Sequence, residues 1–242
     1  LHFHILLLML FTNYNFLSNN FYSLLNLSIM KKILSLFISV ISLMNYSKAQ
    51  KSSFGFTAGA TFAPYKIKEE SVSITAKTKV GFTAGVTSFI ALGRHFSFMP
   101  ALNFTQKGGK FKEEDFTGNT TFNYLELPLN FIYNTNSTKG KFFVGAGPSL
   151  AFGLSGKDKW EEGTESGSDK IKFGSGDDDD LKSFDAGINF LAGYKFAGGF
   201  LIAANYNAGL SNLGNTDEGD NSKMHNRYFG IRIGYMFTGK KK

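Results

Sequence analysis

The stretch Tyr124–Tyr133, YLELPLNFIY, alternates strictly between two kinds of side chain. One set of alternate residues (one parity) is apolar, and the other set (the opposite parity) carries Glu126 and Asn130. Strict period-2 alternation predicts a β-strand, and about ten residues is the length that a tilted strand needs to cross a bilayer. A strand of a soluble β-sandwich would show the same pattern, so the rest of the chain has to decide. The apolar, uncharged parity consists of Leu125, Leu127, Leu129, Phe131 and Tyr133.

Seven further segments repeat this alternation after residue 50. Each of the eight is near the length of a membrane-crossing strand, and eight is an allowed even number for a single-chain membrane barrel. In order, the segments are Phe54–Ala63, Val80–Ile90, Phe96–Lys107, Tyr124–Tyr133, Lys141–Gly153, Phe184–Phe196, Phe200–Leu210 and Tyr228–Phe237.

The two parities differ in the same way in every segment. One is apolar, with aromatic residues toward its ends, as lipid contact and interfacial girdles require. The other mixes glycines with polar and charged residues, which suits the narrow lumen of an eight-stranded barrel. A soluble sandwich or lipocalin-like carrier would bury the apolar parity instead. We therefore predict an all-β fold: an eight-stranded, antiparallel, up-and-down transmembrane β-barrel.

The connections between the segments are alternately long and short. The long gaps are 64–79, 108–123, 154–183 and 211–227, and the short ones are 91–95, 134–140 and 197–199. In an up-and-down barrel this places all long connections at one rim and all short turns at the other. Long extracellular loops and short periplasmic turns are the bacterial outer-membrane arrangement, so we expect that location and contact with outer-membrane lipid.

The first fifty residues have the features of a targeting segment. Residues 30–49 begin with Met30, a basic pair and an apolar run, and end at Ser47-Lys48-Ala49, which predicts a signal peptide cleaved before Gln50. We expect residues 1–29 to be a mis-annotated upstream extension. The alternative is a short N-terminal membrane helix at His4–Phe16. The barrel is then expected over residues 50–242.

Composition excludes several classes of function. The chain has no cysteine, which rules out disulfides and thiolate metal sites. Its formal net charge of +7 comes from scattered lysines and a Lys240–Lys242 tail rather than from a nucleic-acid motif, so we expect no nucleic-acid partner. Gly145-Ala146-Gly147 is followed by Pro148, not by a helix, and so is not a dinucleotide loop. The sequence indicates no cofactor.

Several segments resemble a known family. YLELPLNFIYN at Tyr124–Asn134, FFVGAGPSLAFGL at Phe142–Leu154 and RYFGIRIGYMF at Arg227–Phe237 are similar to strands of PorT-like outer-membrane β-barrel proteins of Bacteroidetes. FDAGINFLAGYKF at Phe184–Phe196 and ANYNAGLSNL at Ala204–Leu213 are similar too. The resemblance implies the barrel. Because the family includes a component of a protein-secretion and gliding apparatus, it also implies an envelope or secretion-machinery protein as a candidate partner.

Charged residues of the inward parity are the main candidate site. A buried charge is costly unless it is paired, so we predict a lumen network of ion pairs and hydrogen bonds. Strands four and eight lie opposite each other in the ring, which favours a Glu126–Arg232 bridge. This network either plugs the barrel or lines a polar permeation path. Its predicted members are Lys107, Glu126, Asp185, Lys195 and Arg232.

Two loop features are weaker candidates. The acidic run Asp177, Asp178, Asp179 and Asp180 would at most bind a cation weakly, because its spacing does not match an EF-hand loop. A solvated loop is the other interpretation, and we predict no metal site. His225, with Asp220 and Ser222 nearby, is an inventory for a catalytic triad without any indication of its geometry.

These observations favour a non-enzymatic integral outer-membrane barrel with a structural, anchoring or interaction role through its loops. The first alternative is a narrow porin or channel for small solutes. A loop-based outer-membrane enzyme and a soluble carrier are the other two.

Overall fold

The computed structural model describes residues 52–63, 66–69, 72–75, 78–112, 116–135, 137–174, 176, 179–214 and 224–238. All of them belong to one compact unit, Gln50–Lys242. The predicted upstream extension (1–29) and signal peptide (30–49) lie outside the described residues. The described part contains no helix long and apolar enough to cross a membrane.

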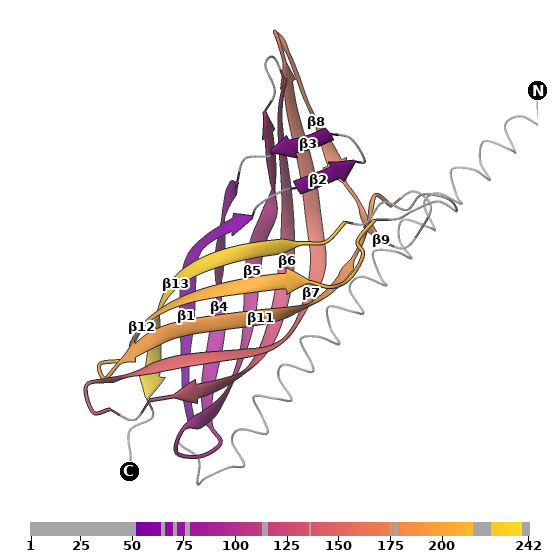
Figure 1. The fold of residues 1–242 in the computed structure, drawn as a ribbon. Coiled ribbons are helices and arrows are strands. Elements are labelled where there is room, and N and C mark those ends of the chain that lie inside the picture. The colour runs from indigo at the N-terminus through magenta and orange to yellow at the C-terminus, as the bar shows by residue number, and fades with distance from the viewer. Residues whose placement is uncertain are drawn as a thin grey trace, which may run out of the picture. The chain divides into compact units, whose positions relative to one another are not determined.

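Eight antiparallel strands form a closed ring within the described residues (Figure 1). Their order is β1, β4, β5, β6, β7, β11, β12 and β13, and β13 pairs with β1 to close the barrel. The predicted fold class is therefore confirmed. The bounds are β1 (Ser52–Ala63), β4 (Lys79–Ala91), β5 (Phe96–Lys112), β6 (Phe116–Asn134), β7 (Gly140–Glu162), β11 (Phe184–Phe196), β12 (Phe200–Gly209) and β13 (Arg227–Thr238).

Five shorter strands lie in the connections. The hairpin of β2 and β3 follows β1, and β8 pairs with the end of β7 outside the ring. A parallel pair, β9 and β10, precedes β11. Their bounds are β2 (Lys66–Glu69), β3 (Val72–Thr75), β8 (Glu165–Ile171), β9 (Phe173–Gly174) and β10 (Leu181–Lys182).

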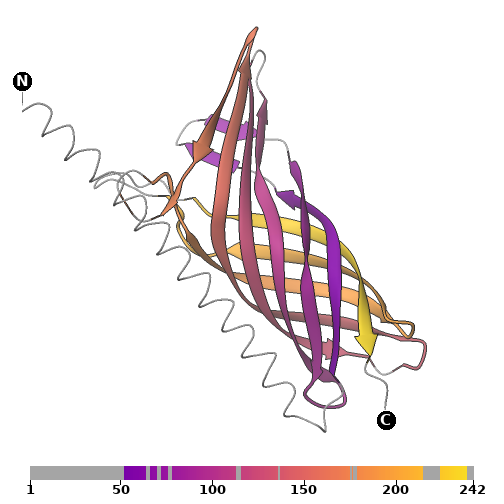
Figure 2. The ribbon, with the colours of Figure 1, turned by 180° about the vertical axis from the view of Figure 1, so that it is seen from behind.

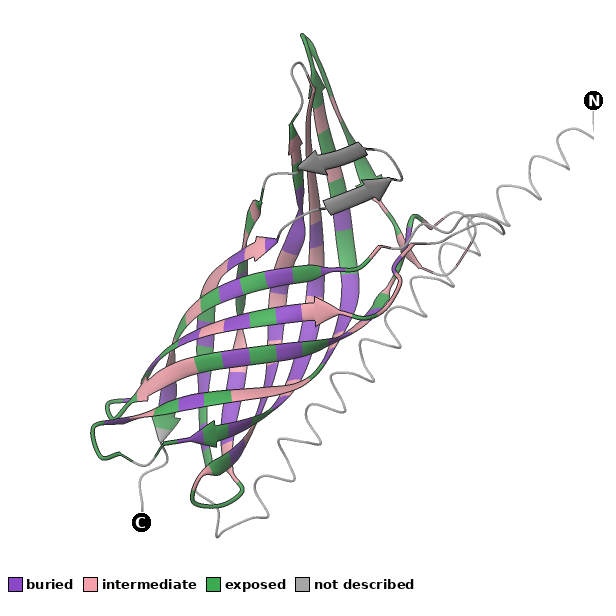
Figure 3. Cartoon of the chain, viewed as in Figure 1, coloured by how far each residue is buried: buried purple, intermediate pink, exposed green. Residues whose placement is uncertain are grey.

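Burial alternates along the ring strands, as the sequence pattern predicted (Figure 3). In β1, Phe54 and Phe56 are exposed on the outer face while Ser53 and Thr57 are buried. The same alternation runs along β11 and β12. Large apolar side chains thus cover the outside, an arrangement that is stable when lipid rather than water surrounds the barrel.

The short turns lie at one end of the barrel, together with the start of β1 and the end of β13 (Figures 1 and 2). They connect β4 to β5, β6 to β7 and β11 to β12. Gly199 in the last turn has a φ of +94°, a conformation that side chains with a Cβ rarely adopt. We call this end the short-turn end, and the opposite end the long-connection end.

The predicted strand ends at 107, 124 and 153 are wrong, because three strands continue beyond the bilayer-length segments. β5 runs to Lys112, β6 begins at Phe116 and β7 reaches Glu162, where it turns through Gly163 into β8. Backbone pairing continues from β5 through β6 and β7 to β8, so these strands extend the sheet past the ring (Figure 2). Apart from residues such as Phe122 beside the ring, most side chains of this extension are exposed or half-buried, so period-2 alternation is no longer required. We call these paired segments, 108–112, 116–123, 154–162 and 165–171, the projecting sheet.

Candidate functional site

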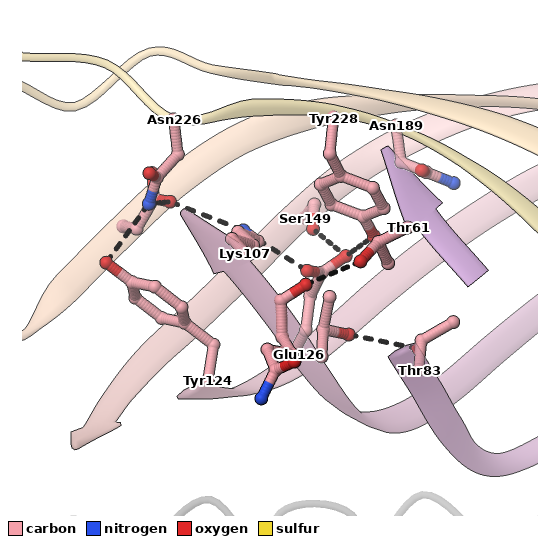
Figure 4. A network of polar contacts seen from close by, with 12 residues as sticks. Thr61, Thr83, Lys107, Tyr124, Glu126, Ser149, Asn189, Asn226 and Tyr228 are labelled. Atoms are coloured by element: carbon pink, nitrogen blue, oxygen red, sulfur yellow. Dashed lines mark hydrogen bonds and ion pairs between the residues drawn. The ribbon is translucent and has the colours of Figure 1, made fainter. Parts of the chain in front are cut away.

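Three charged side chains from three strands meet inside the barrel (Figure 4). Lys107 of β5 places its Nζ 3.3 Å from Glu126 Oε2 of β6 and 3.6 Å from Asp185 Oδ2 of β11. The side chains are only 2%, 0% and 3% exposed, in that order. The register of β5 with β6 and the inward parity of all three residues bring them together.

Two tyrosines surround the Lys107 ammonium. Its Nζ lies 4.8 Å from the ring centroid of Tyr124 and 5.2 Å from that of Tyr228. The negative face of an aromatic ring stabilises a desolvated cation. Asn226 connects one of these rings to the ions, because its Nδ2 donates to Tyr124 Oη and to Asp185 Oδ2, both at 3.0 Å.

Glu126 and Arg232 are linked through a hydroxyl group. Tyr228 Oη donates to Glu126 Oε1 at 2.7 Å and accepts a hydrogen bond from Arg232 Nη2 at 3.1 Å. Ser149 Oγ also donates to Glu126 Oε1, at 3.4 Å. The structure thus brings Arg232 to the network through Tyr228, where the sequence suggested a direct bridge across the lumen. We call Lys107, Glu126, Asp185, Arg232, Tyr124, Tyr228 and Asn226 the ionic layer.

A chain of asparagines continues the network toward the short-turn end. Asn205 Nδ2 donates to Asn189 Oδ1 at 3.0 Å, and Asn189 Nδ2 donates to Asn130 Oδ1 at 2.9 Å. Asn130 Nδ2 in turn donates to the Met99 carbonyl at 3.4 Å. A cavity of about 30 Å³ beside this chain and Arg232 has room for only one or two water molecules.

Apolar side chains fill the lumen on both sides of these polar groups. At the short-turn end the cluster consists of Phe89, Met99, Ile132, Phe143, Leu191, Leu201, Ala203 and Met236. At the other end it consists of Phe122, Tyr124, Ala151, Leu181 and Leu213, with Ile171, Phe173 and Met224 packed against it. The alternation of the sequence predicts glycines and polar groups on the inward parity, and it gives no indication of this apolar filling.

Lys195 lies apart from the ionic layer. It follows Asn189 by six residues on β11, at the short-turn end, where its Nζ lies 4.8 Å from the ring centroid of Phe89. The structure therefore brings Lys107, Glu126, Asp185 and Arg232 into one network and leaves Lys195 outside it.

The loop candidates gain no support as binding or catalytic groups. Asp179 Oδ2 accepts the Gly176 amide at 2.9 Å and Asp180 Oδ2 accepts the Lys172 amide at 2.8 Å, while Asp177 and Asp178 lie outside the described residues. Where the structure describes the chain, no group of three or more acidic or histidine side chains is placed to hold a metal ion.

His225, the histidine of the triad inventory, contacts a backbone carbonyl. Its Nδ1 lies 2.9 Å from the Ser211 carbonyl. Asp220 and Ser222, the other two residues of that inventory, lie outside the described residues. The described residues therefore do not define the geometry of a triad.

The tyrosines and asparagines of the network were not among the predicted site residues. Tyr124 shares the parity of Glu126, and Tyr228 shares the parity of Arg232. Parity was therefore a sufficient signal to place them in the lumen. It gave no indication that their hydroxyl groups complete the hydrogen bonds of the charges.

The family model for the outer membrane protein β-barrel domain matches residues 47–215. No curated protein matches the chain at a significant level.

Among solved structures, the chain is similar to the attachment invasion locus protein Ail of Yersinia pestis (16% identity, 77% of this chain and 99% of that chain, TM-score 0.39). It is also similar to the outer membrane protein OprG from Pseudomonas aeruginosa (13% identity, 78% and 98%, TM-score 0.46). A third is E. coli outer membrane protein W (17% identity, 78% and 100%, TM-score 0.39).

The match of the family model runs from before β1 into the connection that follows β12, which is more than half of the chain. The closed ring of eight strands with an apolar outer face agrees with it. The chain is thus a bacterial outer-membrane protein and belongs to the outer membrane protein β-barrel domain family.

Proposed function

We propose that this protein is a non-enzymatic, non-conducting barrel that anchors its projecting sheet at the outer membrane for contact with a partner. The observation that carries the proposal is the filled lumen, in which the ionic layer lies between two apolar clusters. A solute crossing the barrel would have to displace both clusters and break the buried ion pairs.

The projecting sheet supplies the interaction surface of this proposal. Among the described strands, β8 pairs with β7 on one side only and ends the sheet order, which leaves its other edge available for an added strand. Trp160 of β7 lies across Gly167 of β8, where a Cβ would collide with the indole ring. This contact stiffens a hairpin whose other side chains are mostly charged or small.

The resemblance to PorT-like proteins belongs to the same proposal. It rests on YLELPL at Tyr124–Leu129 and on the other similar strands, and it favours an envelope or secretion-machinery protein as the partner. Lipid contacts the outer face, where aromatic residues such as Phe142 and Phe200 are each 64% exposed.

A narrow porin is the second candidate, because buried charges in a lumen also occur along permeation paths. Conductance across planar bilayers separates the two. We expect no steady unitary conductance from the purified barrel. Steady openings that change in size when Arg232 is replaced by Gln would contradict the closed-barrel proposal.

Cysteine labelling in intact cells tests the anchoring geometry. The chain has no cysteine of its own, so single substitutions give single labelling sites. Glu162→Cys at the tip of the projecting sheet should react with a membrane-impermeant maleimide in whole cells. Thr138→Cys, in the exposed β6–β7 turn, is the matched control and should react only after the outer membrane is permeabilised. The reverse pattern would show that the projecting sheet faces the periplasm.

A further inference from the structure

A second hollow lies at the short-turn end of the barrel, separate from the ionic layer. It has a volume of about 440 Å³ and is formed by the three short turns and the adjoining strand ends. The apolar cluster, through Phe89 and Met236, closes it toward the lumen. We call this hollow the vestibule.

Three cationic side chains line the vestibule: Arg94 from the β4–β5 turn, Lys141 from β7 and Lys195 from β11. Lys141 and Lys195 are paired residues on neighbouring strands, and both have the inward parity. Like charges directly opposite each other in a sheet are destabilising. The vestibule thus concentrates positive charge on the inside of the barrel mouth.

Carboxylates do not offset this charge among the described residues. The lining of the vestibule contains no Asp or Glu. The described ion pairs involve only Lys107, Glu126 and Asp185, in the ionic layer. All other described acidic residues lie in the connections of the long-connection end or in the projecting sheet.

The remaining lining adds small hydrogen-bonding groups. Five residues contribute hydroxyl groups and one contributes a side-chain amide, while the other residues apart from the three cations are glycine or apolar; the polar ones are Ser52, Ser53, Ser97, Ser137, Thr138 and Asn134. Cations beside hydroxyl donors, without any carboxylate, are the recognition chemistry of a phosphate group. The ring of Phe89 lies under the Lys195 ammonium and holds this long side chain against the vestibule wall.

We propose that the vestibule binds a small soluble anion of the phosphate type, inorganic phosphate or a phosphate monoester. Arg94, Lys141 and Lys195 provide the positive charge, and the turn hydroxyls provide further donors. A phospholipid headgroup offers the same phosphate chemistry. Lipid, however, contacts the outer face of the strands, whereas Lys141 and Lys195 have the inward parity, which favours a soluble ligand.

Isothermal titration of the refolded barrel with inorganic phosphate tests this proposal. The protein is held in a non-ionic detergent, and sodium chloride at matched ionic strength is the control titrant. We expect saturable binding at one site to the wild type. The double substitution Lys141→Gln/Lys195→Gln should weaken it about tenfold or more, as expected when charge-assisted hydrogen bonds are lost.

Lys157→Gln/Lys159→Gln is the matched control. It also removes two positive charges, but from the part of β7 that belongs to the projecting sheet. It should bind phosphate as the wild type does. Phosphate should also raise the thermal unfolding temperature of the wild type and of the control, but not that of the vestibule variant. Gel mobility before and after boiling shows whether each variant is folded, and the vestibule variant should fold because it loses a repulsion.

The two sources of phosphate are separated by titrating glycerol 3-phosphate and a short-chain phosphatidylglycerol in parallel. Binding of the lipid alone would overturn the assignment to a soluble anion. The proposal also fails if the wild type shows no saturable phosphate binding, or if the vestibule and control variants bind phosphate equally well.

Discussion

Replacing Lys107 by Met should destabilise the barrel more than any other single lysine substitution in β5. The ionic layer is balanced, since Lys107 and Arg232 offset Glu126 and Asp185. At an effective dielectric constant of about 20, charges 3.3 and 3.6 Å apart attract by about 5 kcal/mol each. Desolvation of the three ions cancels much of this in the intact network.

The substitution removes the attraction but leaves both carboxylates buried. For a buried pair broken in this way, the expected loss is about 3–5 kcal/mol in the free energy of unfolding. Urea titration of the barrel in lipid vesicles measures this quantity, with the folded fraction read from unboiled gels. Lys110→Met is the matched control on the same strand. Because Lys110 is exposed, its removal should change stability by less than about 0.5 kcal/mol.

A second substitution separates loss of the charge balance from loss of packing. Asp185→Asn keeps the shape of the side chain and can still accept the hydrogen bond from Asn226. In the Lys107→Met background it removes the unbalanced charge, so it should restore part of the lost stability. The reasoning is refuted if Lys107→Met costs less than about 1 kcal/mol, or if Asp185→Asn lowers the stability of that variant further.

Two further substitutions test other layers of the lumen. Gly147→Ala should lower the free energy of unfolding by about 1–3 kcal/mol in urea titrations, because the added Cβ would collide with the backbone of the neighbouring strand. Gly93→Ala is the control and should be nearly neutral, since Gly93 lies in a turn with open space around it. Equal losses of stability in the two variants would contradict this account. Asn189→Leu should cost about 2–3 kcal/mol, since it leaves buried polar groups of Asn130 and Asn205 without their partner; a neutral result in the same titration would show that the asparagine chain is dispensable.

The transmembrane part of the fold could be predicted from the sequence because lipid imposes a strict rule on it. Every outward position between the two interfaces must be apolar, so period 2 marks both the strands and their orientation. The predicted segment Phe184–Phe196 has the same bounds as β11. The rule does not apply outside the membrane, where water replaces lipid. β6 therefore continues through residues 117–121, which are polar or glycine, without an alternation that would mark it as a strand.

A β-bulge explains why one predicted strand ended too early. Tyr124 of β6 pairs with Gly153, but Asn123 pairs with Ser155, so Leu154 has no partner there. The extra residue shifts the parity of β7 by one, and alternation counted from Lys141 fails at that point. The backbone pairing beyond Leu154 is visible only in three dimensions.

The apolar layers were missed for a different reason. The inward parity was equated with polar residues, yet Ile132, Phe143 and Met236 share it at the short-turn end. Nothing in alternation distinguishes a side chain that packs in a closed lumen from one that faces lipid.

The two apolar clusters also determine what the ionic layer has to do. Because they keep bulk water from the charges, each ion must find its partners within the protein. β6 and β13 lie on opposite walls of the ring, and an eight-stranded lumen is just wide enough for side chains to fill. The Tyr228 hydroxyl meets this demand as donor to Glu126 and acceptor from Arg232. Conduction would require this bridge and both clusters to open together, whereas an anchor is made more rigid by each of them.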